Sequence, residues 1–228
     1  MSGGQPGLLG AADAVFDAER ALRQAAETVD ELADVAASSL RVLDEVAADA
    51  FYARQDDRRE FYLESAGEHL GRLHNRSGVM TELGDDLTRH LSEASEAIER
   101  AGSELGSEFD VNDDDKQVGA LRTQIDVLSE VVALARPFAD QITRHALHAA
   151  ESTKQTDVEM MLDTQLHDAD REMSRADEDV AMMRAVIGSA QSRATTSVAL
   201  AGALSHAAPA PPIVPPAQRS HPVSGMAI

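Results

Sequence analysis

The sequence predicts an all-α protein, an elongated antiparallel bundle of about four long helices followed by a proline-rich tail. Apolar residues recur with a period of seven over long stretches, which places them along one side of a helix. Aromatic residues make up only 3% and Trp is absent, so the core would consist of Ala, Leu, Val and Met. Such a core suits close helix packing better than a β-sandwich. Stretches of nearly equal length joined by short links are typical of an up-down bundle.

The helix boundaries follow from breaks in this repeat. Its phase slips by one residue across 54–62 and again across 154–161. A turn accommodates such a slip more easily than an overwound helix does. Each helix would be roughly 55–65 Å long at about 1.5 Å per residue. The predicted helices are residues 11–53, 56–105, 116–153 and 158–205.

The first helix distinguishes the bundle from its alternative, a long two-arm helical hairpin that turns only at 106–117. A two-stranded coiled coil normally carries charges beside its seam, whereas the flanking positions here are apolar. An apolar face this wide must contact more than one neighbouring helix, which favours the bundle. The flanking apolar residues are Ala21, Ala26, Ala33, Val35, Leu40, Val42 and Ala47.

Residues that disfavour helix occur inside the second and third helices. Gly67 and Gly84 each cost about 1 kcal/mol in a helix interior. The run His-Asn-Arg-Ser-Gly leaves open a break of the second helix near 75–78. Pro137 falls on the outer face of the third helix, which we expect it to kink.

The two ends of the chain differ in composition from the helical region. Residues 1–10 are rich in Gly and are expected to be flexible. Residues 207–228 contain six of the eight prolines and are predicted to be a disordered, partly polyproline II tail. Pro209, Pro212 and Pro215 follow the P-x-x-P spacing that docks in aromatic-lined grooves, although a plain spacer has the same composition.

Asp and Asn residues crowd the link between the second and third helices, which raises the question of a calcium-binding loop. An EF-hand loop needs oxygen ligands at positions 1, 3 and 5, Gly at 6 and Glu at 12. Counted from Asp110, position 6 is Asp115 and position 12 is Leu121, so the turn residue and the bidentate ligand are both missing. We expect a turn whose Asp residues favour the start of the third helix, and no specific calcium site.

His145, His148 and Glu151 form an H-x-x-H-x-x-E series of the kind that can hold a metal. In the heptad frame these three residues wind around the exposed side of the third helix, whereas bundle di-metal proteins project Glu and His into the core. The polar residues of the predicted seams are Ser39, Ser77, Thr153 and Ser197. The other off-seam histidines are expected on the surface: His69, His74, His90 and His167. This pattern disfavours a metal-binding bundle enzyme.

Composition and motifs narrow the function further. Neither a G-x-x-x-x-G-K-[ST] phosphate loop nor a G-x-S-x-G nucleophile motif occurs, and the absence of Cys excludes thiolate chemistry. We therefore expect no enzymatic activity and no cofactor. The formal charge of −20 repels phosphate, which argues against nucleic-acid binding. No transmembrane segment or secretory signal is predicted, so the cytoplasm is the expected location, with leaderless secretion as the alternative.

Tyr52 and Asp56 form a Tyr-x-x-x-Asp pattern at the end of the first helix. This pattern resembles the export signal of type VII secretion substrates, which are also leaderless helical hairpins. The Trp-x-Gly turn of that family is absent, and the pattern follows the first helix rather than lying near the C-terminus. The residues alone support a second interpretation, in which Tyr52 packs at a bundle end beside a solvated run of charges.

The expected function is that of a non-enzymatic structural or interaction protein: a coiled-coil-like scaffold, adaptor or assembly subunit. It would act through protein–protein contacts, with self-association as a further option. Two alternatives stay open, a leaderless secreted helical effector resembling type VII substrates and a metal-binding helical-bundle enzyme. The candidate interaction residues are Tyr52, Asp56, Pro209, Pro212 and Pro215.

Overall fold

The computed structural model describes residues 5–108, 116–154 and 163–207, which contain no β-strand. Apart from a short turn at 54–58, these residues are helical. At about 1.5 Å per residue the helices are roughly 58–75 Å long. The predicted all-α fold with four long helices is confirmed. The helices are α1 (Gln5–Ala53), α2 (Arg59–Glu108), α3 (Lys116–Lys154) and α4 (Asp163–Ala207).

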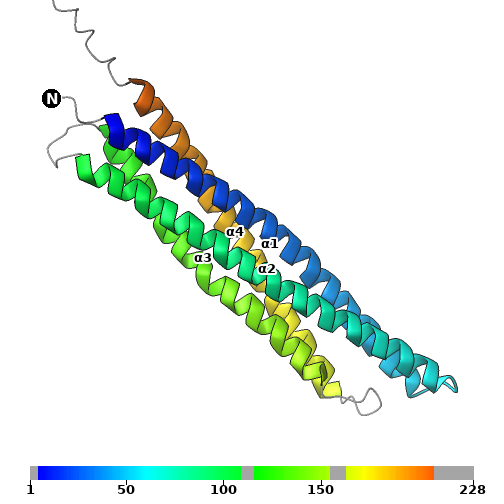
Figure 1. The fold of residues 1–228 in the computed structure, drawn as a ribbon. Coiled ribbons are helices and arrows are strands. Elements are labelled where there is room, and N and C mark those ends of the chain that lie inside the picture. The colour runs from blue at the N-terminus through cyan, green and yellow to red at the C-terminus, as the bar shows by residue number, and fades with distance from the viewer. Residues whose placement is uncertain (1–4, 109–115, 155–162, 208–228) are drawn as a thin grey trace, which may run out of the picture.

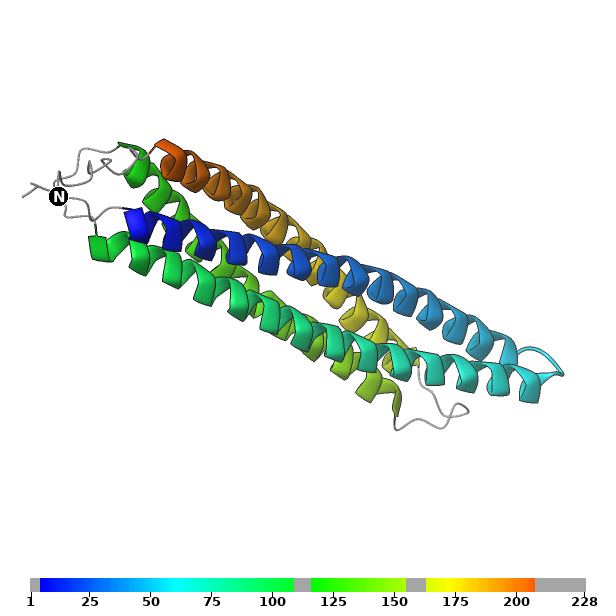
Figure 2. The same cartoon turned by 45° about the horizontal axis from the view of Figure 1, so that its top comes forward.

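The four helices form an antiparallel bundle in which each helix packs against two neighbours (Figures 1 and 2). α1 lies between α2 and α4, and α3 closes the ring. Arg100 Nη2 of α2 is 3.2 Å from Asp17 Oδ2 near the start of α1. Arg184 Nη2 of α4 is 2.7 Å from Asp30 Oδ1 of α1. In a hairpin of two long arms Asp17 would lie far from Arg100, so that alternative is wrong.

The core runs along the bundle and is built from the seam residues of all four helices. Burying each large apolar side chain contributes roughly 1.5–3 kcal/mol. The flanking positions of α1 are used as predicted: Ala21 and Val42 are buried, and Val35 and Leu40 pack against the core. α1 needs this wide apolar face because it contacts both α2 and α4. Large side chains that are fully buried include Leu22, Leu32, Leu73, Leu91, Leu128, Ile142, Met173 and Met183.

The first helix begins at Gln5, inside the segment 1–10 that was expected to be flexible. The reason is packing at the end of the bundle. Leu8 is 9% exposed and belongs to the core. A Cβ added at Gly10 would lie 3.0 Å from the Glu104 carboxyl carbon, so α2 closely covers the start of α1. Helix formation here is therefore set by the neighbouring helix, which outweighs the low propensity of Gly.

The second helix passes through 75–78 without the break that the sequence left open. Ser77 and Met80 are buried, so the register of the apolar face continues across the Gly and Asn residues. The Arg76 guanidinium also donates a hydrogen bond to the Ser38 carbonyl oxygen of α1. These tertiary contacts outweigh the local cost of Gly78, which is about 1 kcal/mol.

Other residues that commonly disturb helices are accommodated within them. The hydroxyl groups of Ser39, Thr153 and Ser197 are buried and donate to main-chain carbonyl oxygens one turn earlier, at 2.8, 3.0 and 2.9 Å. Pro137 lies on the exposed face of α3, which continues through it. Within the described ranges no helix combines the length and the hydropathy needed to span a bilayer.

Two glycines of α2 are expected to respond in opposite ways to the same substitution. A Cβ added at Gly78 meets nothing within 4 Å, so Gly78→Ala should raise the free energy of unfolding by about 0.5–1 kcal/mol through helix propensity. A Cβ at Gly84 would overlap the Thr143 hydroxyl of α3, so Gly84→Ala should lower it by about 1–3 kcal/mol. Urea denaturation of both variants measures the difference.

Thr143→Ala provides the control for this prediction, because it removes the overlapping hydroxyl. In that background Gly84→Ala should no longer destabilise the protein. If Gly84→Ala costs the same with and without the Thr143 side chain, α2 and α3 do not approach each other as closely as described here.

Candidate functional site

An exposed aromatic cluster lies where α1 turns into α2. Phe51 and Tyr52 lie in the last turn of α1, and Phe61 and Tyr62 in the first turn of α2. Ring centroids are 5.7 Å apart for Phe51 and Tyr52, 5.5 Å for Tyr52 and Tyr62, and 5.4 Å for Phe61 and Tyr62. Phe51, Tyr52 and Phe61 nevertheless remain 53%, 50% and 62% exposed. We call these four side chains the aromatic tip.

The concentration of rings at this one place is unusual for the chain. The whole sequence contains five Phe, two Tyr and no Trp, so the aromatic tip holds both tyrosines and two of the phenylalanines. Core packing does not require them there, because the core is made of aliphatic side chains. Exposed aromatic groups gathered in one patch mark interaction surfaces more often than scattered ones do.

The turn at 54–58 holds the two pairs of rings together. The main-chain nitrogens of Gln55 and Asp56 both donate to the Tyr52 carbonyl oxygen at 3.0 Å. Asp56 Oδ1 in turn accepts from the Arg58 main-chain nitrogen at 3.0 Å, as an Asp does when it caps the start of a helix. Tyr52 and Asp56, the residues of the Tyr-x-x-x-Asp pattern, therefore belong to the same turn. Asp56 has a local structural role in it.

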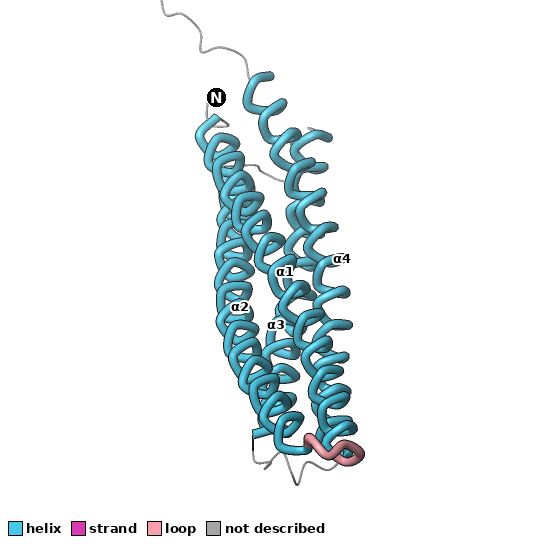
Figure 3. The backbone as a smooth tube through the Cα atoms, turned by 90° about the vertical axis from the view of Figure 1, so that its right-hand side faces the viewer, coloured by secondary structure: helices cyan, strands magenta, loops and turns pink. Residues whose placement is uncertain are grey.

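The aromatic tip lies at the end of a hairpin that extends past α3. His74 Nε2 of α2 is 3.0 Å from Thr153 Oγ1, so the end of α3 is level with His74. Residues 59–73 of α2 therefore continue beyond α3, and Figure 3 shows the α1–α2 turn, in pink, at one end of the bundle. A surface at this end can be reached by a partner without any opening of the bundle.

The segment 51–62, which carries the aromatic tip, has no net formal charge in a strongly acidic chain. Residues 51–62 include three Arg and three acidic residues, whereas the whole chain carries a formal charge of −20. Like charges repel, so a neutral patch is where this chain approaches another acidic surface at least cost. The charged residues of the patch are Arg54, Asp56, Asp57, Arg58, Arg59 and Glu60.

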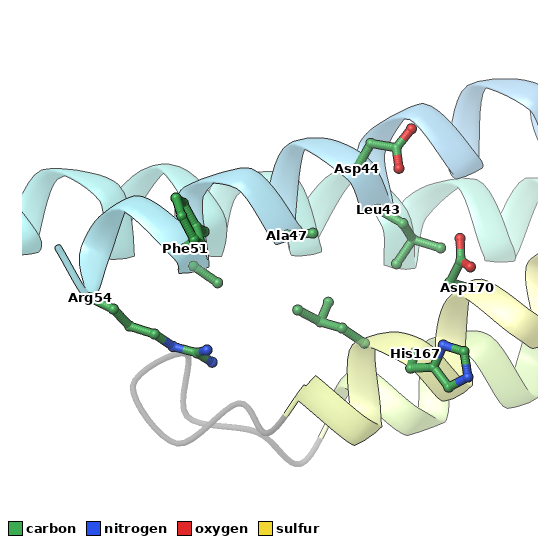
Figure 4. A pocket seen from close by; sticks show the side chains of 9 residues that line it. Leu43, Asp44, Ala47, Phe51, Arg54, His167 and Asp170 are labelled. Atoms are coloured by element: carbon green, nitrogen blue, oxygen red, sulfur yellow. The ribbon is translucent and has the colours of Figure 1, made fainter.

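A cavity of about 440 Å³ adjoins the aromatic tip between α1 and α4. Figure 4 shows Phe51 and Arg54 at one end of it, and Asp44 and Asp170 toward the other. Phe51 belongs both to the aromatic tip and to the cavity, so the two form one continuous surface. The remaining lining residues are Leu43, Ala47, Ala50, Leu166 and His167.

A second group of functional side chains lies between α3 and α4. His145 Nδ1 is 2.6 Å from Glu172 Oε2, and His145 Nε2 is 3.7 Å from Asp179 Oδ2. Arg175 Nη1 donates to the second oxygen of Glu172 at 2.8 Å. Glu172 and Asp179 are both buried, although each is a charged residue type that is seldom buried without a partner. This group ties α3 to α4 through charge-assisted hydrogen bonds.

The two acids of this group are affected in opposite directions. The hydrogen bond from His145 lowers the pKa of Glu172, against the effect of burial, and the charge of Arg175 adds to the lowering. Burial raises the pKa of Asp179, which the charge of His145 partly offsets. His145 therefore lies between a carboxylate held in its ionised form and one shifted toward its protonated form. None of the three lines the cavity beside the aromatic tip.

These positions correct the sequence prediction for several histidines. Four that were expected on the surface are instead buried or partly buried: His69, His74, His90 and His145. Three residues are exposed as expected: His148, Glu151 and His167. The seam of the seven-residue repeat marks only one line of positions along each helix, whereas a helix that contacts two neighbours also buries positions beside the seam. The acids at Glu172 and Asp179 were missed for the same reason.

The remaining candidate residues do not form a further site within the described ranges. His69 Nδ1 is 3.6 Å from both Glu45 Oε2 and Asp49 Oδ2, which are distances for weak ion pairing only. Among the described residues no group of three or more His, Asp or Glu side chains is arranged to hold a metal ion. Two sets of predicted residues lie outside the described ranges: the Asp cluster at 110–115, and Pro209, Pro212 and Pro215.

The chain matches no protein-family model, and comparison with curated proteins and with solved structures yields no significant match. Any functional conclusion therefore rests on the surface and side-chain geometry of this chain.

Proposed function

We propose that this protein is a non-enzymatic interaction protein, a scaffold or assembly subunit that binds a protein partner through its aromatic tip. The observation that carries the proposal is the exposure of Phe51, Tyr52 and Phe61 at the end of the bundle, where the four rings of the aromatic tip contact one another in series. Leaving three large rings half in water forgoes hydrophobic stabilisation that a partner would recover on binding.

The chemistry of the patch agrees with this role. Tyr and Arg are enriched among the residues that contribute most to protein–protein binding, and the aromatic tip places both tyrosines beside Arg54, Arg58 and Arg59. The hydrogen-bonded turn between α1 and α2 holds the two pairs of rings together, so little conformational entropy is lost when a partner binds. A helical bundle that presents a small, fixed patch at one end suits an adaptor or assembly subunit.

The His145 group supports the same reading, because its contacts join helices rather than line a cavity. Glu172 uses both carboxylate oxygens in hydrogen bonds to His145 and Arg175. A group engaged in this way stabilises the α3–α4 contact and is not arranged as a free acid or base beside a substrate. We therefore assign the group a structural role in the proposed function.

A second candidate function is that of a secreted protein, and one observation favours it. Tyr52 is half exposed, and Asp56 lies at the same turn, so a recognition component could contact both at the surface. Replacement of Tyr52 by Ala should then abolish secretion from the native host while the folded protein accumulates inside the cell. Unchanged secretion of that variant would exclude this candidate.

Affinity capture with matched variants tests the proposed function. Phe61→Ser removes an apolar side chain that is 62% exposed in the aromatic tip, and Leu134→Ser removes one that is also 62% exposed, on α3. Phe61→Ser combined with Tyr52→Ser should lose the main partner recovered from the source organism, as expected for central interface residues. Leu134→Ser should retain it.

Circular dichroism should show that the variants used for capture are folded, because the three substituted side chains are exposed. Recovery of the same partners in the same amounts by the doubly substituted protein would contradict the proposal. Loss of the partners by Leu134→Ser alone would move the binding surface from the aromatic tip to α3.

A further inference from the structure

We infer that the proline-rich segment 208–228 of one copy docks on the aromatic tip and adjoining cavity of a second copy, so that the protein assembles head to tail. This inference rests on the proposed function and names the partner of that surface. Three observations carry it: the chemistry of the two surfaces, the distance between them and their charges.

The first observation is the match between surface and segment. Proline-rich sequences with P-x-x-P spacing dock in grooves lined by aromatic side chains, because the polyproline II conformation is already extended and little entropy is lost on binding. Residues 209–217 read Pro-Ala-Pro-Pro-Ile-Val-Pro-Pro-Ala and contain this spacing twice. The aromatic tip with its cavity offers Tyr52, Phe51 and the apolar side chains of Leu43 and Leu166 in one continuous surface.

The second observation is distance, which excludes docking within one chain. α4 ends at Ala207 beside the start of α1, at the opposite end of the bundle from the aromatic tip (Figure 1). α1 spans the bundle and is about 73 Å long, since it contains 49 residues. Pro215 is eight residues beyond Ala207, so an extended chain places it at most about 28 Å away. The prolines therefore reach an aromatic tip only on another copy.

The third observation is charge. Residues 208–228 contain no Asp or Glu and include Arg219, whereas the whole chain carries −20. The cavity beside the aromatic tip is lined by two carboxylates, Asp44 and Asp170, and by one arginine, Arg54, so its carboxylates outnumber its arginine and attract Arg219. Most faces of two such acidic bundles repel each other. The segment and the aromatic tip are the parts of the chain that meet without this penalty.

Direct pairing of the aromatic tips of two copies is less favourable than docking of the proline-rich segment. An aromatic side chain buries about 150–250 Å² in full, so four partly exposed rings offer on the order of 400 Å² per copy. Two tips together would then bury roughly 800 Å², below the 1,200 Å² or more of a stable interface. Docking of the proline-rich segment adds a second partner surface and fills the cavity as well. Because each copy would carry one donor segment and one acceptor tip, the contact is heterologous and generates chains or rings.

Sedimentation velocity of the full chain over a concentration series tests the inference. The unsubstituted protein should show association that grows with concentration. Two variants should each weaken that association about tenfold or more: a tip variant, Tyr52→Ser with Phe61→Ser, and a segment variant in which Pro209, Pro212 and Pro215 are replaced by Ala. The melting temperature of the segment variant should equal that of the unsubstituted protein, since the buried core lies within residues 8–204.

A mixture of the two variants gives the sharpest result. The tip variant retains an intact segment and the segment variant an intact tip, so the pair should form a complex of two copies and nothing larger. Neither variant alone should do so. Pairing through two tips, or through the sides of the bundles, does not predict this rescue. Failure of the mixture to form the complex overturns the inference, as does association that the segment variant leaves intact.

Tyrosine fluorescence reports the docking site itself, because the only tyrosines of the chain are Tyr52 and Tyr62 and Trp is absent. A synthetic peptide of residues 208–228 contains no aromatic residue. Its addition to the segment variant should change the tyrosine emission saturably, and the same peptide with its P-x-x-P prolines replaced by Ala should bind about tenfold more weakly or not at all. No change in emission at any peptide concentration would overturn the inference.

These outcomes separate the inference from the proposed function. If the peptide does not bind and the full chain stays monomeric, while Phe61→Ser with Tyr52→Ser still loses a partner from the source organism, the aromatic tip binds another protein and only the head-to-tail assembly is wrong. If those substitutions change neither capture nor association, both are wrong.

Discussion

Replacing Leu128 by Ala is expected to lower the free energy of unfolding by about 2–5 kcal/mol, the largest stability effect that we predict. Leu128 lies in α3 and is 0% exposed within the core. Its truncation removes buried methyl groups and leaves a cavity that the surrounding helices fill only in part. Urea denaturation followed by the helical circular dichroism signal measures the loss.

Leu134→Ala is the matched control, since the same change is made in the same helix at a side chain that is 62% exposed. It should alter the free energy of unfolding by no more than about 0.5 kcal/mol. His148→Ala, also on the exposed face of α3, should behave in the same way. Equal losses for Leu128→Ala and Leu134→Ala would mean that α3 is rotated about its axis relative to the structure described here.

Replacing Glu172 by Gln is expected to lower the free energy of unfolding at neutral pH by about 1–3 kcal/mol. Glu172 is buried, and its two carboxylate oxygens accept charge-assisted hydrogen bonds from His145 and Arg175. A neutral amide keeps the shape of the side chain but loses the charge that these partners stabilise. Urea denaturation at pH 7 measures the loss.

The same variant should show a changed dependence on pH. In the folded protein the pKa of Glu172 is lowered from the ordinary Glu value of 4.5, mainly by the hydrogen bond from His145. A lowered pKa contributes stability that is complete above about pH 4.5 and is lost as the pH falls through the folded value. Glu172→Gln should therefore lose less stability than the unsubstituted protein when the pH is taken below 4.5.

Asp179→Asn provides a control of opposite sign. Burial raises the pKa of Asp179 above the ordinary Asp value of 3.8, so stability falls as the pH rises above about 3.8, and this loss is complete above the folded value. Its replacement by Asn should leave stability at pH 7 unchanged or raise it. If Asp179→Asn and Glu172→Gln destabilise the protein equally, with the same pH dependence, the opposing environments described for the two acids are wrong.

Much of the fold could be predicted from the sequence because the helices are specified locally. The seven-residue repeat marks the core side of each helix, and Leu128, Ile142 and Met173 are buried where it predicts. The slip of the repeat across 54–62 indicates the first turn, which the structure places at 54–58. The sequence places two aromatic residues on each side of that turn, which is the pattern from which the aromatic tip could have been predicted. The contact between the two pairs of rings was not predicted.

Only the tertiary structure decided which polar residues beside the seams are buried and what they contact. The pairing of His145 with Glu172 depends on how α3 and α4 are rotated and shifted relative to each other. The seven-residue repeat of either helix does not specify that rotation or shift. The same holds for the cavity beside Phe51, which needs α1 and α4 together. The continuity of α2 through Gly78 was also decided by packing, because burial of Met80 and the contact of Arg76 with α1 outweigh the local preference for a break. The repeat thus specifies the core face of each helix. Which side chains of the neighbouring helices meet the residues beside that face is settled only when all four helices are in place.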